Sequence, residues 1–375
     1  MEKDVVQILK ELIEIPSYED IYENHDIVKY LENAFSDCCE IKKIITKENK
    51  NCHLLIGVNT KLKNVDKCIV FSGHMDTILP SKGHSPVAVL ANNCVQGLGA
   101  ADMKCFLASI ICNKEKLKNC KYPIIISITS DEEFDFYGIA GIADKMKELE
   151  IKPTLIVIGE PTNSAYSITN IGNTIFVSEM KGKACHTSTP QLGINAINLS
   201  ARFISEIENI SNQFGSSASV CVVSVNGGGI VNVVPDSCTV KVSVRTSNLS
   251  TLQKITNLLQ VSHTNIGKNT QSKLEKVFSI PPFEKKNNNF AQYLSLRSNG
   301  CLTESKFTTE AGDFQVAFND AEIIIYGPGN PDCIHKAGEK INVKDLIKYS
   351  DGLADIIDIY LSYEKNRSYK YERVL

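Results

Sequence analysis

Several features typical of other protein classes are missing from this 375-residue chain. It has no C-x-x-C pair among its 13 cysteines, and an odd number in so long a chain argues against a disulfide framework. We expect mostly reduced thiols in the core. No apolar run reaches the ~18 residues that span a membrane. The start, "MEKDVVQILKELIEIPSYED", carries acidic residues throughout its apolar pattern, unlike a signal peptide.

No segment of the sequence is rich in charge of one sign. The formal net charge is −3, charged residues make up 22% and hydrophobic residues 43%. This composition favours a folded protein over a disordered one and gives no sign of nucleic-acid binding. We therefore expect a soluble cytoplasmic protein that acts on a small molecule, without nucleic-acid or membrane partners.

The apolar segments predict an α/β domain. Four short unbroken runs have the pattern of strands buried on both faces, namely "KCIVFSGHMD", "YPIIISITSDEE", "TLIVIGEP" and "EIIIYGPG". Helical patterns accompany them at 4–14, 101–117 and 343–361. This alternation predicts a mixed, mostly parallel sheet sandwiched between helices.

The middle of the chain has a different pattern. Residues 219–225 and 238–246 alternate apolar and polar residues, as antiparallel strands with one solvated face do. Helical patterns flank them at 190–207 and 249–260. We infer an inserted α+β domain, which makes the α/β domain discontinuous. The predicted ranges are 1–168 and 282–375 for the α/β domain and 169–281 for the inserted domain.

Ionisable residues follow the first three apolar runs. They are His74 and Asp76, then Asp131, Glu132 and Glu133, then Glu160. Because open α/β sheets bind ligands at the carboxyl ends of their strands, we expect these side chains to converge in one crevice. Asp102, at the start of a helical pattern, and His335, after the fourth run, are further candidates.

Such a crevice would hold at least five metal ligands. Imidazoles mixed with carboxylates suit a borderline ion such as zinc, and a bridging carboxylate permits two ions about 3.5 to 4 Å apart. His74 and Asp76 share a face of an extended chain, so the carboxylate can accept the second N–H of a metal-bound imidazole. Glu132 and Glu133 point to opposite sides and need not have the same role.

Simpler interpretations exist for each residue taken alone. Asp102 would serve equally well as a helix N-cap, and Glu160 as a loop carboxylate before the turn-forming Pro161. A lone histidine such as His335 is more often structural than a ligand. The histidines outside these motifs have no comparable context, and we interpret them as structural.

Seven motifs, read in order, resemble those of the dinuclear zinc peptidase family M20. They are "SGHMDTILP", "GLGAADMK", "TSDEEF", "IGEPT", "KGKACHTSTPQLGINAI", "NVVPDSCTVKVSVR" and "TEAGDF…YGPGNPDCIHKAGE". The resemblance is greatest to the family's acetylornithine deacetylases, with succinyl-diaminopimelate desuccinylases and glutamate carboxypeptidases as relatives. It implies a zinc-peptidase catalytic domain and an inserted ferredoxin-like domain that acts as a lid and forms a homodimer.

The resemblance implies a role for each matching residue of the catalytic domain. One zinc ion would be held by His74 and Glu160, the other by Glu133 and His335, with Asp102 bridging both. Glu132 would be the general base, and Asp76 would orient His74. Cobalt would be able to substitute for zinc. No catalytic role is implied for Asp131, which is expected to fix the turn.

Three residues of the inserted domain also match positions in the family's motifs. His186 would enter the partner subunit's active site and polarise the scissile carbonyl, while Asn232 and Arg245 would contact the substrate's carboxylate. A simpler interpretation of Arg245 is a solvated strand face, which it shares with Lys241 and Ser243.

The implied activity is hydrolysis of the N-acyl amide bond of an N-acylated amino acid, foremost N-acetylornithine to ornithine and acetate in arginine biosynthesis. Glu310 would offer a negative charge to an ornithine-like side chain. Desuccinylase, carboxypeptidase or aminoacylase activity is the alternative within the family. Two other classes stay open: an inactive metal-binding module, and a nicotinamide dehydrogenase, because "GLGAAD" faintly resembles G-x-G-x-x-G.

The sequence departs from the family pattern at positions that are not predicted ligands. Leu98 replaces the usual arginine before the bridging aspartate, and Cys105 replaces the glycine after the lysine of "DMK". The chain has no tryptophan, so the aromatic residue often found beyond the "GHxD" segment is missing. These departures concern the choice of substrate more than the chemistry.

Overall fold

The computed structural model describes residues 4–18, 25–46, 51–81, 87–284 and 289–372. The chain folds into two compact units. Unit 1 comprises Met1–Ile168, Lys285–Ser305 and Asp313–Leu375, and unit 2 comprises Thr169–Glu284 and Lys306–Gly312. Unit 2 thus includes residues 282–284 and Lys306–Gly312, which the sequence-based division assigned to the α/β domain.

Unit 1 is built on an eight-stranded mixed sheet with the order β1-β2-β6-β3-β7-β16-β8-β15. Its strands are β1 (Glu40–Ile45), β2 (Cys52–Gly57), β3 (Val65–His74), β6 (Ile124–Thr129), β7 (Ile151–Ile158), β8 (Tyr166–Ser167), β15 (Leu302–Thr303) and β16 (Glu322–Ile325). The central neighbours β6, β3, β7 and β16 are parallel. The expected α/β fold with a mixed, mostly parallel sheet is therefore confirmed.

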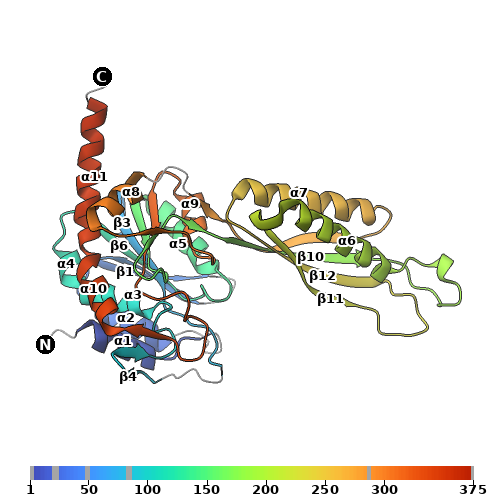
Figure 1. Cartoon of the computed structure of the whole chain (residues 1–375), viewed down its shortest axis with the longest axis horizontal. Coiled ribbons are helices and arrows are strands. Elements are labelled where there is room, and N and C mark those ends of the chain that lie inside the picture. The colour runs from blue at the N-terminus through green and yellow to red at the C-terminus, as the bar shows by residue number, and fades with distance from the viewer. Residues whose placement is uncertain (1–3, 19–24, 47–50, 82–86, 285–288, 373–375) are drawn as a thin grey trace. The chain divides into compact units, whose positions relative to one another are not determined.

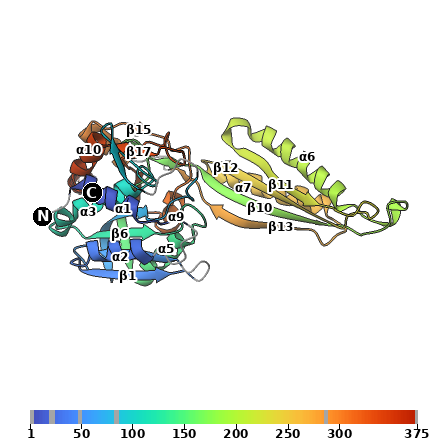
Figure 2. The same ribbon diagram turned by 90° about the horizontal axis from the view of Figure 1, so that it is seen from below.

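Helices cover both faces of this sheet (Figures 1 and 2). They are α1 (Val5–Glu14), α2 (His25–Ala34), α3 (Lys104–Cys112), α4 (Lys114–Lys118), α5 (Tyr137–Glu148), α8 (Asn289–Ser298), α9 (Ala311–Ala317), α10 (Val343–Leu353) and α11 (Asp355–Glu372). Helices α1, α3 and α10 pack against one another, while α5 packs on β1, β2, β6 and β7. A small sheet of β4 (Val89–Ala91), β5 (Cys94–Gln96) and β17 (Lys340–Asn342) completes unit 1.

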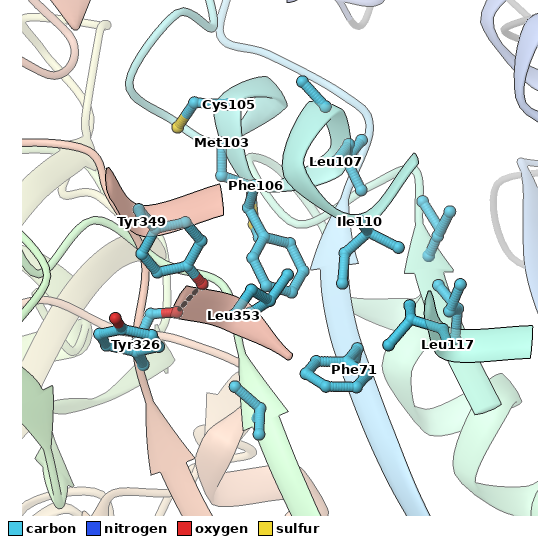
Figure 3. Packing of buried hydrophobic residues seen from close by; sticks show 14 of the residues in the cluster. Phe71, Met103, Cys105, Phe106, Leu107, Ile110, Leu117, Tyr326, Tyr349 and Leu353 are labelled. Atoms are coloured by element: carbon cyan, nitrogen blue, oxygen red, sulfur yellow. Dashed lines mark hydrogen bonds between the residues drawn. The ribbon is translucent and has the colours of Figure 1, made fainter. Parts of the chain in front are cut away.

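The main core lies between the sheet and the helices that include α1, α3 and α10. Figure 3 shows Phe71 of β3 beside residues of α3, α4 and α10, including Phe106, Leu117 and Leu353. The buried Tyr349 hydroxyl donates to the main-chain oxygen of Tyr326 at 2.8 Å, so its polar atom is satisfied inside this apolar cluster.

Two long helical patterns of the sequence are each interrupted in the structure. The pattern 101–117 becomes α3 and α4, separated at Asn113, whose side-chain amide donates to the main chain of Ser109 and Ser350. The pattern 343–361 becomes α10 and α11, separated at Ala354. Apolar periodicity persists through both breaks, because the two helices of each pair bury their apolar faces in the same core.

Unit 2 is an α+β structure. Its four-stranded antiparallel sheet has the order β11-β12-β10-β13, formed by β10 (Gly172–Lys181), β11 (Ser219–Gly227), β12 (Ser237–Thr246) and β13 (Lys273–Ile280). A short pair joins β9 (Thr169–Asn170) to β14 (Phe283–Glu284). Helices α6 (Ala196–Phe214) and α7 (Leu249–Ile266) lie on one face of the larger sheet (Figure 1).

The alternation of apolar and polar residues along the strands decides which face of the unit 2 sheet the two helices cover. Cys238, Val240, Val242 and Val244 of β12 are buried, whereas the residues between them are half-buried or exposed. Each covering helix begins at an asparagine whose side chain accepts main-chain N–H groups, Asn195 for α6 and Asn248 for α7. The amphipathic pattern and the caps together fix both helices on the apolar face.

All 13 cysteines are unpaired thiols. Only Cys68, Cys105 and Cys238 are buried, so the expectation that most of them lie in the core is wrong. None of the described helices has the length and apolar composition needed to cross a membrane.

Candidate active site

Three parallel strands bring the ionisable segments together. His74 is the last residue of β3, and it pairs with Thr129 at the end of β6, while Ser72 pairs with Ile158 at the end of β7. The loops that follow these strands therefore leave from the same edge of the sheet. Glycine is required at Gly159, because a side chain there would collide with the Phe106 ring.

The first group of candidate ligands surrounds the buried His74 ring. Its Nε2 lies 3.2 Å from Oδ1 of Asp102 and 3.7 Å from Oε1 of Glu160. These residues are 6% exposed or less. Oε2 of Glu132 lies 4.0 Å from the same nitrogen, at the margin of the group.

The orientation of His74 is fixed from its other nitrogen. Nδ1 lies 2.9 Å from the main-chain oxygen of Asp76, a pure acceptor, so Nδ1 carries a proton and Nε2 faces the carboxylates. Oδ1 of Asp76 is 3.6 Å away from Nδ1. Asp76 therefore holds the ring mainly through its carbonyl, and its carboxylate is the longer contact.

The second group forms around His335. Its Nε2 lies 3.3 Å from Oδ2 of Asp102 and 3.0 Å from both carboxylate oxygens of Glu133. The His335 side chain is 48% exposed, and its backbone has a φ of 56°, a conformation uncommon for residues other than glycine. Such backbone conformations concentrate at functional sites.

Asp102 belongs to both groups. The ligand atoms of His74, Asp102 and Glu160 lie within 4.8 Å of one another, and so do those of Asp102, Glu133 and His335. Asp102 does not cap a helix, because α3 begins at Lys104 with Met103 at its N-cap and no side-chain cap. Two imidazoles and three carboxylates arranged in this way fit a pair of divalent cations.

The electrostatics of the site come from crowded carboxylates. Burial and the neighbouring Glu160 raise the pKa of Glu132 well above its ordinary value. Hydrogen bonds to Asp102 and Glu133 raise the pKa of His335 to about 10. Because an imidazolium cannot bind a metal, cations entering the site would displace protons from the histidines.

Asp131 and His53 hold the turn that carries the two glutamates. The carboxylate of Asp131 accepts the main-chain N–H of Gly138, at 2.9 Å to Oδ2, and its carbonyl accepts that of Asp135. Nδ1 of the buried His53 accepts the N–H of Ser130 at 3.1 Å. His53 lies outside the seven motifs, so no feature of the sequence indicates this contact.

Two of the predicted substrate contacts lie side by side in unit 2. His186 forms an antiparallel bridge with Val233, and the main-chain oxygen of Asn232 accepts the N–H of Thr187 at 3.1 Å. Nδ1 of the exposed His186 accepts the N–H of Ser188 at 3.1 Å, so the proton of the neutral ring is on Nε2. This nitrogen is an available donor.

Arg245 lies at the opposite end of the unit 2 sheet. It pairs with Asn173 near the start of β10, whereas Lys181 at the end of β10 precedes the His186 loop. Eight strand residues at ~3.3 Å each separate the two positions by roughly 26 Å. Arg245 is exposed and shares its face with Lys241 and Ser243. The structure thus brings the five candidate ligands, Glu132 and Asp76 together in unit 1, and places the other three predicted residues in unit 2.

Similarity to known proteins extends over most of the chain. Residues 168–270 match a family described as the peptidase dimerisation domain of M20. An acetylornithine deacetylase of Buchnera aphidicola is 28% identical, with 90% of this chain and 93% of that protein aligned. A probable succinyl-diaminopimelate desuccinylase of Staphylococcus epidermidis is 23% identical, with coverages of 96% and 98%.

Solved structures share the fold. A tripeptidase of Staphylococcus aureus has a TM-score of 0.74 at 19% identity, covering 96% of this chain and 98% of its own. A dinuclear metal-binding M20 peptidase of Bacillus subtilis has a TM-score of 0.68 at 14% identity, with coverages of 96% and 98%. The site, together with these relatives, identifies the chain as a metal-dependent hydrolase that acts on amides. The resemblance to the M20 metallopeptidases is thereby confirmed, together with the presence of the family's dimerisation domain.

Proposed function

We propose that this chain removes the acyl group from an N-acylated amino acid, with N-acetylornithine as its substrate. The carrying observation is the shared carboxylate of Asp102, whose two oxygens face the imidazoles of two different ligand groups at 3.2 and 3.3 Å. That arrangement supports a two-ion site. The substrate is supported by the 28% identity to an acetylornithine deacetylase over 90% of the chain.

Two zinc ions would occupy the site, and cobalt would substitute for them. Their ligands would be His74 and Glu160 on one side and Glu133 and His335 on the other, with Asp102 between. When bound, the ions supply positive charge that polarises the scissile carbonyl and lowers the pKa of water towards neutrality. The chain's own contribution is to orient both imidazoles, through the Asp76 carbonyl at His74 and through Glu133 at His335.

Glu132 would be the general base. It is buried beside the first group of ligands, and neither group of metal-ligand candidates includes it. Its place beside the first group, with Oε2 at 4.0 Å from Nε2 of His74, suits a carboxylate that accepts a proton from water and then returns it to the leaving amine. An intact Glu132 also argues against an inactive metal-binding module.

His186 would stabilise the oxyanion in the partner subunit of a homodimer. Its Nε2–H is a suitable donor, of a kind worth roughly 3 to 4 kcal/mol in a transition state. Arg245 and His186 of one chain lie too far apart along the sheet for both to touch one small substrate. We therefore assign His186 and Asn232 to one substrate molecule and Arg245 to the carboxylate of another.

Homodimer formation through unit 2 is supported by its outer strand. Strand β11 is at one edge of the four-stranded sheet, and Val223 and Val225 on it are 56% and 52% exposed. A strand edge with exposed apolar side chains is a template for pairing with another chain. The match of residues 168–270 to a dimerisation domain agrees with this surface.

Glu310 would select the cationic side chain of ornithine. It is a buried carboxylate in the segment Lys306–Gly312. Acetylcitrulline has a neutral side chain of similar length, so the ratio of turnover on acetylornithine to that on acetylcitrulline measures this selection. We expect Glu310→Gln to reduce this ratio. A cytoplasmic role in arginine biosynthesis would follow from the activity.

The test combines metal analysis with a panel of substrates. We expect about two zinc ions per chain, loss of activity after chelation, and recovery with zinc or cobalt. Turnover is then compared on acetylornithine, succinyl-diaminopimelate, acetylcitrulline and a dipeptide. Preference for succinyl-diaminopimelate or the dipeptide would replace the substrate but keep the chemistry. A chain that binds metal without hydrolysing any of them would be a binding module.

A further inference from the structure

Glu339 is a buried carboxylate that contacts the main chain around Asp102. It is 2% exposed. Oε1 accepts the N–H of Ala101 at 2.8 Å and that of Asp102 at 3.0 Å, and Oε2 accepts the N–H of Gly99 at 3.2 Å. One side chain therefore satisfies three donors of the turn that presents Asp102. This turn includes Gly99 in the left-handed region, at a φ of 81°.

The same segment also carries His335. Glu339 follows His335 by four residues, and its main-chain oxygen accepts the N–H of Gly97 at 3.0 Å. The next residue, Lys340, pairs with Gln96 in the small sheet. Glu339 thus connects the segment that carries one histidine ligand to both flanks of the turn that carries the shared aspartate.

Burying the Glu339 carboxylate at this position costs desolvation free energy, which its contacts must offset. The side chain of Glu339 is buried against the turn that carries Asp102, away from solvent. Within the described part of the chain no basic side chain lies within ion-pair distance of it; Lys104 attracts it at longer range, and its hydrogen-bond donors are the three main-chain N–H groups. An apolar side chain would leave these donors unsatisfied, whereas a carboxylate accepts all three.

We propose that Glu339 is a positioning residue for the two-ion centre, which fixes the Asp102 carboxylate between His74 and His335. The inference rests on the proposed two-ion function. Glu339 is not a ligand, because both of its oxygens are directed at main-chain donors and neither ligand group includes it. Its effect reaches the ions through the geometry of Asp102. Groups that orient metal ligands typically change metal affinity by about 10- to 100-fold when they are removed.

The decisive variant is Glu339→Gln, which has the same shape. The amide oxygen would still accept from Ala101 and Asp102, but the amide nitrogen would face the N–H of Gly99, and the turn would shift. Glu40→Gln is the matched control, because Glu40 also accepts a main-chain N–H, from Leu62 at 2.8 Å, but lies on the edge strand β1. Glu339→Ala removes all three contacts and should show a larger effect.

The measurements are zinc affinity and stoichiometry by titration, the absorption spectrum of the cobalt-substituted protein, and kcat and KM on the best substrate. We expect Glu339→Gln to bind at least one ion about 10- to 100-fold more weakly, with a changed cobalt spectrum, a lower kcat and a nearly constant KM. Excess zinc should restore much of kcat. Glu40→Gln should match the wild type in all of these measurements.

The outcomes separate this inference from the proposed function. Wild-type affinity and an unchanged cobalt spectrum in Glu339→Gln overturn the positioning role and leave the two-ion site intact. The positioning role is also overturned if the only difference of Glu339→Gln from the wild type is a lower melting temperature of the metal-free form. A wild-type chain that binds no ion overturns both. If the wild type binds a single ion, the affinity ratio between it and Glu339→Gln still decides the role of Glu339.

Discussion

The carboxylate of Asp76 accepts the main-chain N–H of Glu133, with 2.9 Å between Oδ2 and the nitrogen. This hydrogen bond ties the segment after β3 to the segment after β6. Asp76 therefore holds His74 through its carbonyl and Glu133 through its carboxylate. Both ligand groups share this support, which the "GHMD" motif alone attributes only to His74.

Because Glu133 is held in this way, Glu132 and Glu133 should be separable by mutation. We expect Glu132→Gln to lower kcat by about 10²- to 10⁴-fold with zinc content unchanged, since the variant loses the base and no ligand. Glu133→Gln should lose zinc, because Glu133 contacts His335 at 3.0 Å. The measurements are kcat and metal content of both variants. Retained activity in Glu132→Gln would contradict its assignment as the base.

A mixture of two inactive variants tests whether His186 acts across the proposed dimer. Glu132→Gln removes the proposed base, and His186→Ala removes the proposed donor to the oxyanion. In a hybrid dimer, the site on the His186→Ala chain has its own Glu132 and receives His186 from the other chain. Random exchange makes half of the dimers hybrids with one intact site, so activity should recover to roughly a quarter of the wild-type value.

The mixing experiment has a built-in control. Each variant incubated alone under the same exchange conditions should stay inactive. No recovery in the mixture, with exchange verified by differently tagged chains, would mean that His186 acts in its own subunit or has no catalytic role.

His53 should make the stability depend on pH. Burial lowers its pKa in the folded chain to about 4, whereas an unfolded histidine titrates near 6.5. Between these values the unfolded state binds one more proton, so the free energy of unfolding rises with pH by up to ~1.4 kcal/mol per unit. This contribution is complete above about pH 6.5 and is lost as the pH falls towards 4.

The variant His53→Asn isolates this effect, because its amide oxygen can still accept the N–H of Ser130. Urea unfolding of both proteins is compared between about pH 5 and pH 7. Other titrating groups are common to both, so the difference in slope belongs to His53. Parallel stability profiles would show that His53 is not buried in its neutral form.

Lys104 should stabilise the chain although its amine is buried. Its Nζ donates to the main-chain oxygens of Leu12 and Ile15, both at 2.9 Å, at the end of α1. Replacing it with methionine removes a donor from both carbonyls and leaves that of Leu12 only the N–H of Ile15, at 3.3 Å, and we expect a loss of about 2 kcal/mol in unfolding free energy. Lys116→Met, on the exposed part of α4, should change it by less than about 0.5 kcal/mol. Equal effects would contradict this role of Lys104.

The strands and their ionisable ends could be predicted from the sequence, because buried parallel strands are short apolar runs that end at the ligand-binding edge of the sheet. The strand ends at His74 and Ile158 follow directly from this pattern. The helix breaks at Asn113 and Ala354 could not be predicted, since apolar periodicity continues through both.

Resemblance to a family supplied the grouping of His74, Asp102, Glu133, Glu160 and His335, which composition and periodicity alone left open. The contacts of His53 with Ser130 and of Glu339 with the Asp102 turn required the structure. In both cases the partner is a main-chain N–H far away in the sequence, and a backbone donor leaves no trace in residue identity.

The sequence by itself determined the α/β framework, the inserted α+β unit and the residue types of the candidate metal site, because burial patterns and ligand chemistry are encoded locally. Only the tertiary structure decided that the two oxygens of Asp102 face different histidines, that Asp76 supports both ligand groups, and that His186 and Arg245 lie at opposite ends of one sheet. These relationships depend on how strands and turns pair across long stretches of chain, and that pairing is set by the packing of the whole fold.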